Sequence, residues 1–307
     1  MASKKMNGDS MAGGVGRTTA DKVYDVISTI IIILVLLIAL YPMYFVVIAS
    51  ISDPAAVSSG KVILLPKGTS LIGYFKIFRD SRIITGYTNS IIYTAVGTAF
   101  STFITIMGAY SLSRKDLVGG KVLMYLYLFT MYFSAGLIPT YLMVKSLHLI
   151  DTRAIIILLG AVSVYNIIIA RTFFQTALPN ELLEASQLDG CGNIRFFFGI
   201  AMPLSKAIIA VIALYNAVAF WNSYFNAMIY LNDQAKYPLQ LFLKEILVSS
   251  RMVNADIDDP SELAEMQRLA STIKYGVIIV GSLPMLLLYP FIQRYFVKGV
   301  MIGTVKG

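Results

Sequence analysis

The sequence predicts an all-α integral membrane protein with six transmembrane helices. Of its 307 residues, 57% are hydrophobic and 14% are charged, whereas soluble domains average about 45–50% and about 25%. Because so few charges cannot coat a globule in water, much of the apolar surface must face lipid. Six uncharged stretches approach or exceed the roughly 20 apolar residues of a spanning helix. They are 26–50, 83–112, 122–144, 154–170, 207–232 and 275–293.

The first stretch, 26–50, is expected to stay as a membrane helix. Its apolar part is too long for a cleaved signal peptide, and no small-residue cleavage site follows it promptly. Strands of a membrane β-barrel would alternate apolar and polar residues in segments of about ten. Continuous apolar runs such as 30–40 do not alternate, so helices are the expected spanning elements.

The spans carry no ionisable side chain. No Asp, Glu, Lys, Arg or His lies inside any of the six stretches, whereas ion-coupled transporters commonly keep such groups at membrane depth. A nucleotide-binding phosphate loop is also missing, because Gly119-Gly120-Lys121-Val122 lacks the first glycine and the hydroxyl of that motif. The energy for any transport is therefore expected to come from another protein.

The chain has few side chains suited to catalysis or to metal binding. The chain has one cysteine, Cys191, and one histidine, His148, which excludes an intrachain disulfide and leaves little for a His/Cys metal site. A membrane enzyme would need clustered carboxylates, His or Cys near the interface, but the acids concentrate in one polar run, 256–265. We expect no catalytic residue and no metal site. An ion-coupled secondary transporter and a membrane-embedded enzyme stand as the alternatives to a powered permease.

The domain organisation follows from the spans. An N-terminal segment, 1–25, precedes a six-helix domain, 26–293, and a tail, 294–307, follows it. Within the domain two connections are long: 171–206 after the fourth span and 233–274 after the fifth. Lys and Arg divide almost evenly between the two sides, so the positive-inside rule orients the chain only weakly.

The connection after the fourth span predicts a helix–turn–helix along the membrane surface. Asn180 can cap a short helix that carries Glu181 and Glu184 near its positive end. Gly190 permits a sharp reversal, and Pro203 is expected to open the fifth span. Exposed acids beside apolar side chains suit a protein-docking loop, and equally an amphipathic loop that packs on lipid.

This connection resembles the EAA motif of ABC-importer permeases, in which Glu-Ala-Ala is followed at set spacings by Gly, by Ile and by Leu-Pro. The matching positions are Glu184, Ala185, Ser186, Gly190, Ile200, Met202 and Pro203. Ser replaces the second Ala and Met replaces Leu, with little change in size. The end of the chain, 296–307, also resembles the tail of a maltose-importer permease, and 237–240 resembles the start of its outer loop. The resemblance covers nearly the whole chain.

The chain is therefore similar to the carbohydrate-uptake group of ABC-importer permeases, near those for complex polysaccharides or oligosaccharides. The resemblance implies a type I ABC importer fold with a cytoplasmic coupling helix between helices 4 and 5. It implies an ATP-driven, binding-protein-dependent importer of sugars in the cytoplasmic membrane of a prokaryote, with both chain termini in the cytoplasm. The net charge of +8 weakly favours acidic oligosaccharides as the substrate.

The resemblance also implies partners. They are a second homologous permease, a dimer of ATPase subunits that uses ATP and Mg, an extracellular sugar-binding protein and membrane lipid, without nucleic acid and without a cofactor in this chain. The implied ATPase-coupling positions are Glu181, Glu184, Ala185, Ser186, Asp189, Gly190 and Pro203. The implied tail contacts with the ATPase are Gly303, Lys306 and Gly307, although a chain end is often loose. The loop 233–274 is expected to meet the binding protein, or to be a solvated face.

A polar line on the fifth predicted span is a candidate for the translocation path. On one continuous helix, Tyr215, Asn222, Asn226 and Tyr230 would share a face about 80° wide. Trp221 and Tyr224 would lie beside it. Aromatic faces and amides suit sugar rings. The alternative is that the asparagines bond to neighbouring helices, while Tyr and Trp mark the membrane interface.

Overall fold

The computed structural model describes residues 18–252, 273–288 and 290. The first helices in chain order are α1 (Thr19–Ser50), α2 (Pro54–Ser58), α3 (Ile72–Arg79), α4 (Ser81–Ser113), α5 (Gly120–Tyr132), α6 (Leu137–Ser146), α7 (Arg153–Leu159) and α8 (Val164–Ala177). Then come α9 (Asn180–Leu188), α10 (Asn193–Phe196), the π-helix η1 (Phe197–Ala201), α11 (Met202–Leu204), α12 (Lys206–Trp221), α13 (Phe225–Tyr230), the 3₁₀-helix η2 (Gln234–Lys236) and α14 (Leu239–Met252). A further apolar helix is Ile273–Leu288. Apart from one isolated bridge between Ser52 and Thr69, the regular structure within these ranges is helical.

Two helices are long and apolar enough to cross a bilayer in one piece. α1 has 32 residues and begins at a capping box of Thr18 and Asp21. α4 has 33 residues and begins where the side chain of Asp80 accepts a bond from the backbone N–H of Arg82. The prediction of helical first and second spans is confirmed.

The third, fourth and fifth predicted spans are helical but interrupted, so the expectation of continuous helices there was wrong. α5 and α6 meet at 113°, and α7 and α8 meet at 51°. The first break holds Gly136, the N-cap of α6, at φ +82°, a conformation that glycine tolerates and other residues rarely adopt. The fifth span ends as α12 at Trp221, and α13 starts only at Phe225. Composition shows how apolar a stretch is, but it does not show where the axis turns.

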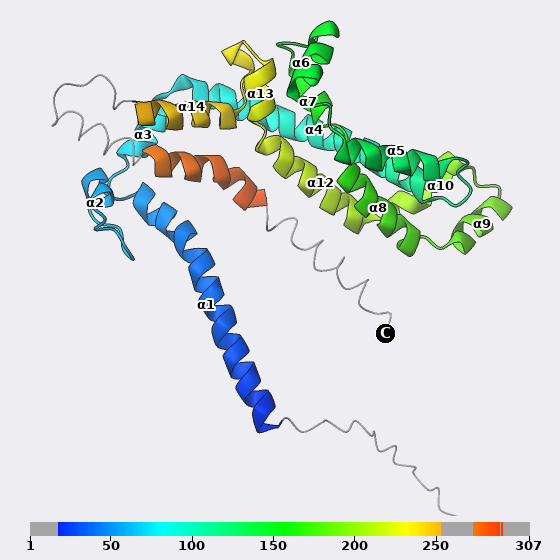
Figure 1. Ribbon diagram of the computed structural model, residues 1–307, viewed down its shortest axis with the longest axis horizontal. Coiled ribbons are helices and arrows are strands. Elements are labelled where there is room, and N and C mark those ends of the chain that lie inside the picture. Colours follow the sequence, from blue (N-terminus) through cyan, green and yellow to red (C-terminus); the bar gives the residue numbers. More distant parts are fainter. Residues whose placement is uncertain (1–17, 253–272, 289, 291–307) are drawn as a thin grey trace, which may run out of the picture.

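α4 is the centre of the bundle. It packs along α12, α8 and α14 and also touches α7 and η2, and Figure 1 shows these helices side by side while α1 extends away from them. At the closest approach the ring of Phe220 of α12 fits against Gly97 and Gly160. A Cβ atom on either glycine would lie 2.7 Å from that ring, which is too close for any larger residue.

Polar side chains join the same helices inside the bundle. The Nδ2 of Asn166 donates to Oδ1 of Asn216 at 3.0 Å, and the Nδ2 of Asn216 donates to Oγ1 of Thr102 at 3.1 Å. All three residues are buried. These bonds satisfy amide groups that would otherwise be unpaired in hydrocarbon.

Some predicted regions lie outside the described residues. They are the first part of the N-terminal segment, the acidic run 256–265 and the tail 294–307, which carries Gly303, Lys306 and Gly307.

Candidate functional site

The connection after α8 folds as the predicted helix–turn–helix. α9 and α10 are separated by a turn in which Gly190 has φ +74°, so the reversal expected at this glycine is confirmed. Asn180 is not the cap, as we had expected, because Pro179 takes the N-cap position and α9 makes no side-chain capping bond there. We call the stretch from α9 through α11 (180–204) the coupling segment.

The candidate coupling residues divide between two sides of α9. Glu181, Glu184, Ala185, Asp189 and Gly190 are exposed, so their surface is open to a partner. Ser186, in contrast, is 7% exposed, and its hydroxyl donates to the carbonyl of Leu183 at 2.7 Å. The opposite side of the helix therefore packs inward, where Leu182 and Leu183 lie against the apolar core.

An aromatic cluster holds the coupling segment against α4. Tyr110, near the end of α4, contacts Phe174 of α8 at 5.7 Å, Phe196 at 6.4 Å and Phe197 at 5.0 Å between ring centroids. All four residues are buried. One tyrosine thus joins α8, α10 and η1 at the C-terminal end of α4.

Arg114 extends this contact with hydrogen bonds. Its Nη1 donates to the hydroxyl of Tyr110 at 3.2 Å and to Oδ1 of Asn193 in α10 at 3.0 Å. Its Nε donates to Oδ1 of Asp116 at 2.8 Å. The bond from Arg114 lowers the pKa of the Asp116 carboxyl and raises the pKa of the guanidinium, so the pair is charged at neutral pH. Nearby, Nε of Arg171 donates to the carbonyl of Leu112 at 2.9 Å.

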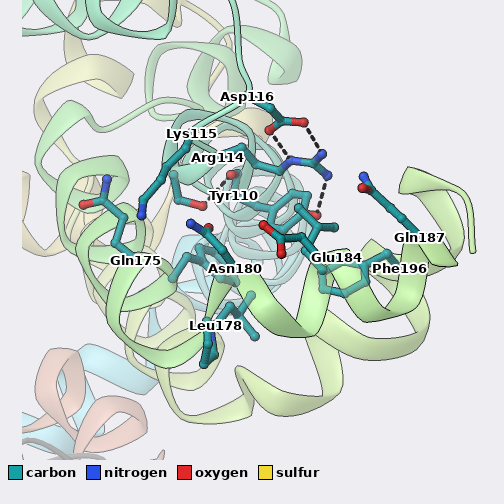
Figure 2. Close-up of a pocket in the computed structure, with 14 residues that line it drawn as sticks. Tyr110, Arg114, Lys115, Asp116, Gln175, Leu178, Asn180, Glu184, Gln187 and Phe196 are labelled. Atoms are coloured by element: carbon teal, nitrogen blue, oxygen red, sulfur yellow. Dashed lines mark hydrogen bonds and ion pairs between the residues drawn. The ribbon is translucent and has the colours of Figure 1, made fainter.

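A cavity of about 290 Å³ lies between these groups and α9. Figure 2 shows Arg114 between Asp116 and Tyr110, with Glu184 and Gln187 of α9 lining the same space. Among the residues in the described ranges, no group of three His, Cys, Asp or Glu side chains could hold a metal ion. The site is therefore a contact region of charged, amide and aromatic groups.

Pro203 does not open the fifth span, which corrects the expectation. It lies in α11, and the helical path from Asn193 to Leu204 turns by 82° before α12 begins at Lys206. Proline donates no backbone hydrogen bond and its ring crowds the preceding turn, and the turn before it is the π-helix η1. Ser205, at the bend, is fully buried.

The candidate path residues do not share one helical face, because the helix breaks after Trp221. Tyr215 and Asn222 are exposed, as is Tyr224 in the break, while Asn226 on α13 is half-buried. Trp221 is 2% exposed, and its Nε1 donates to the carbonyl of Gly281 at 2.8 Å. In this conformation Trp221 therefore fastens α12 to the helix Ile273–Leu288.

Tyr110, Arg114 and Asn193 were not among the sequence candidates. Arg114 follows a long apolar span, where a basic residue is ordinary. Asn193 lies between Gly190 and Ile200, at a position that the motif does not specify. Arg114 and Asn193 are 79 residues apart in the chain, and no local pattern signals such a pairing.

Comparison with known proteins identifies the family. No family model matches the chain. It is 41% identical over 287 residues to the polygalacturonan/rhamnogalacturonan transport system permease protein YtcP of Bacillus subtilis, covering 94% of this chain and 99% of that protein. It is 39% identical to protein LplC of the same organism, covering 94% and 97%. This chain belongs to the permease subunits of carbohydrate ABC importers.

A solved structure agrees with this family. The permease matches a chain in the crystal structure of a bacterial ABC transporter involved in the import of the acidic polysaccharide alginate, with a TM-score of 0.79 and 31% identity, covering 91% of this chain and 98% of that one. As an ABC permease the chain is a membrane transport subunit, not an enzyme, and it needs no cofactor itself. The alternatives of an ion-coupled transporter and a membrane enzyme find no support among these relatives.

Proposed function

We propose that this permease forms a path for oligosaccharides together with a second, homologous permease. A dimer of ATPase subunits, which uses ATP and Mg, supplies the energy, and an extracellular binding protein delivers the sugar. The observation that carries the proposal is the two-sided α9: Glu181, Glu184 and Asp189 are exposed on one side, while the other side is packed onto α4 and α8. A helix with one exposed and one packed side can contact the ATPase and transmit its displacement to α4 and α8.

The chemistry of α9 fits docking on a protein. Carboxylates at the surface can pair with basic groups of the ATPase, Ala185 allows close approach, and Gly190 holds a left-handed turn that a side chain would strain. Docking on the ATPase requires the coupling segment to lie in the cytoplasm. Both ends of the chain, 1–25 and 294–307, then lie on the same side, and the loop 233–274 faces the binding protein outside a prokaryotic cytoplasmic membrane.

The substrate class proposed is an oligosaccharide that carries carboxylates. Two relatives are named for such polymers, a polygalacturonan and the acidic polysaccharide alginate, and the chain carries a net charge of +8. The residues proposed along the path remain Tyr215, Asn222, Asn226, Trp221 and Tyr224, with Trp221 needing to leave its buried position to meet sugar. The tail residues Gly303, Lys306 and Gly307 remain the proposed second contact with the ATPase.

The test is uptake by the complete transporter in proteoliposomes. The wild-type complex should take up labelled trigalacturonate, and not neutral maltotriose, only with ATP and binding protein. Glu184→Ala and Gly190→Asp should assemble but lose uptake by about fivefold or more, since allosteric coupling is typically worth that much. Gly119→Asp is the matched control, because Gly119 also has positive φ, +77°, and open space around it.

Two results would contradict the proposal separately. Full ATP-coupled uptake by Gly190→Asp would contradict the coupling role of this turn. Uptake of maltotriose in place of trigalacturonate would leave the coupling role intact and overturn the acidic substrate class.

A further inference from the structure

α4 is an uninterrupted connection between the coupling segment and the outer surface. Its 33 residues span about 50 Å at 1.5 Å per residue. The backbone routes out of the coupling segment are less direct. The route into α12 turns by 82° at Ser205, and the route into α8 continues to α7 only through a 51° bend. Among α4, α8 and α12, α4 is the unbroken route available to a displacement of α9, and side chains connect it to the coupling segment.

The inner end of α4 is joined to the coupling segment by Arg114. This residue is the C-cap of α4, and its side chain is only 11% exposed. Through Asn193 it reaches α10, and through Tyr110 it reaches the aromatic cluster under α9. Asp116 holds the other edge of the guanidinium, which keeps its plane in position between the two elements.

The outer end of α4 is joined as firmly to the loop around η2. Nδ2 of Asn89 donates to the carbonyls of Ala235 at 2.8 Å and Tyr237 at 3.0 Å. The hydroxyl of Tyr93 donates to the carbonyl of Lys236 at 2.8 Å. Asn89 and Tyr93 are buried. The 235–237 backbone must therefore follow any displacement of this end of α4.

We propose that Arg114 is a positioning residue that transfers movement of the coupling segment to α4, and that α4 carries it to the outer loop at η2. The proposal rests on the coupling function proposed above and names the residue through which it acts. An arginine is required because its planar fork bonds to Asp116 on one edge and to Tyr110 and Asn193 on the other. A lysine has one compact charge and cannot hold all three.

The experiment follows the outer loop in the assembled transporter. An environment-sensitive fluorophore on Gln234→Cys, in a Cys191→Ser background, reports η2 when ATP is added. Arg114→Ala should reduce the ATP-driven fluorescence change about fivefold or more, while ATP hydrolysis continues and the thermal midpoint of the complex holds. Asn193→Ala should act in the same direction, and Arg114→Lys should restore part of the signal. Lys121→Ala, an exposed cation at the start of α5, removes the same charge and should change nothing.

The outcomes separate this role from the coupling function itself. One outcome is a full ATP-driven fluorescence change in both Arg114→Ala and Asn193→Ala but none in Glu184→Ala and Gly190→Asp. That outcome would overturn the role of Arg114 alone. A full change in all four variants would overturn the coupling function as well. If Arg114→Ala does not assemble, Asn193→Ala decides, because Asn193 is exposed and leaves the bonds from Arg114 to Asp116 and Tyr110 in place.

Discussion

α1 and α4 are two membrane helices of nearly equal length with opposite environments. α1 has 32 residues and a mean hydropathy of 2.9 over its most apolar stretch, none of which is buried within the chain. α4 has 33 residues and a hydropathy of only 1.5, yet 33% of the corresponding stretch is buried. Among the described residues, the more apolar helix is thus the one whose most apolar stretch is left uncovered.

The difference in burial between α1 and α4 shows which side chains hold helices together in a membrane bundle. Lipid tails are as apolar as leucine, so apolar surface alone does not draw two helices together, and small and polar residues do. The buried residues of α4 include Gly97, Asn89, Ser101, Thr102 and Thr105, whereas the middle of α1, 30–40, is almost entirely Ile, Leu and Val. Within the described residues, this exposed stretch of α1 is available to lipid.

The largest effect is expected from filling the space beside Gly97. Gly97→Leu places a side chain where the ring of Phe220 already lies 2.7 Å from the Cβ position. This overpacking should cost about 3 kcal/mol of stability, measured as a lower midpoint of thermal unfolding in detergent. Gly108→Leu is the control on the same helix, because nothing lies within 4 Å of its Cβ position. Equal losses of stability in Gly97→Leu and Gly108→Leu would contradict the distinction between a packed and an open face of α4.

A matched pair of deletions compares α4 and α1 directly. Ile106→Ala removes a side chain that is 1% exposed and should cost about 2 kcal/mol. Ile33→Ala removes the same atoms from a side chain that is 50% exposed and should stay within about 0.5 kcal/mol. Chemical denaturation of the isolated chain in detergent measures both. A cost for Ile33→Ala as large as for Ile106→Ala would show that α1 packs onto its own chain.

The buried amides should contribute less than the packing. Asn216→Ala removes the bonds to Asn166 and Thr102 and leaves both partners unpaired, which should cost about 1 kcal/mol in a membrane bundle. Thr88→Ala is the control, since Thr88 is exposed on α4 and bonds only within its own helix, to Ile84. Unfolding free energies of the two variants give the comparison, and indistinguishable values would argue against these amides as links between helices.

The smallest effect is expected at η2, where the ion pair of Asp151 and Lys236 is partly exposed to water. The hydrogen bond from Lys236, together with those from the backbone of Asp233 and Asn232, lowers the pKa of the Asp151 carboxyl. A group with a lowered folded-state pKa stabilises the fold above its unfolded value, about 3.9, and loses that contribution as pH falls through the folded value.

Wild type and Asp151→Asn should therefore differ in stability, by a constant small amount, from neutral pH down to about pH 4. The difference should vanish at more acidic pH, when Asp151 is protonated. Hydrogen exchange of the 232–237 backbone between pH 7 and pH 3 measures this, with the shift in intrinsic exchange rate subtracted. A difference that grows on acidification would have the wrong sign for an ionised Asp151.

The sequence by itself determined the features that depend on local composition and backbone geometry. The membrane class follows from the uncharged stretches, and the helix–turn–helix after α8 follows from its spacing and from Gly190. The family follows from the same motif. These features need no knowledge of distant residues, because hydropathy and glycine geometry act within a few positions along the chain.

The tertiary structure decided what depends on residues that are far apart in the chain. The interruption after Trp221 removed the single polar face expected for Asn222 and Asn226, because that face required one straight helix. The fit of Phe220 onto Gly97 and Gly160 sets which faces of α4 and α12 meet. Arg114 and Asn193 come together across 79 positions. The physical reason is that packing between helices in lipid depends on shape and on paired polar groups, and neither has a signature in the hydropathy of one segment.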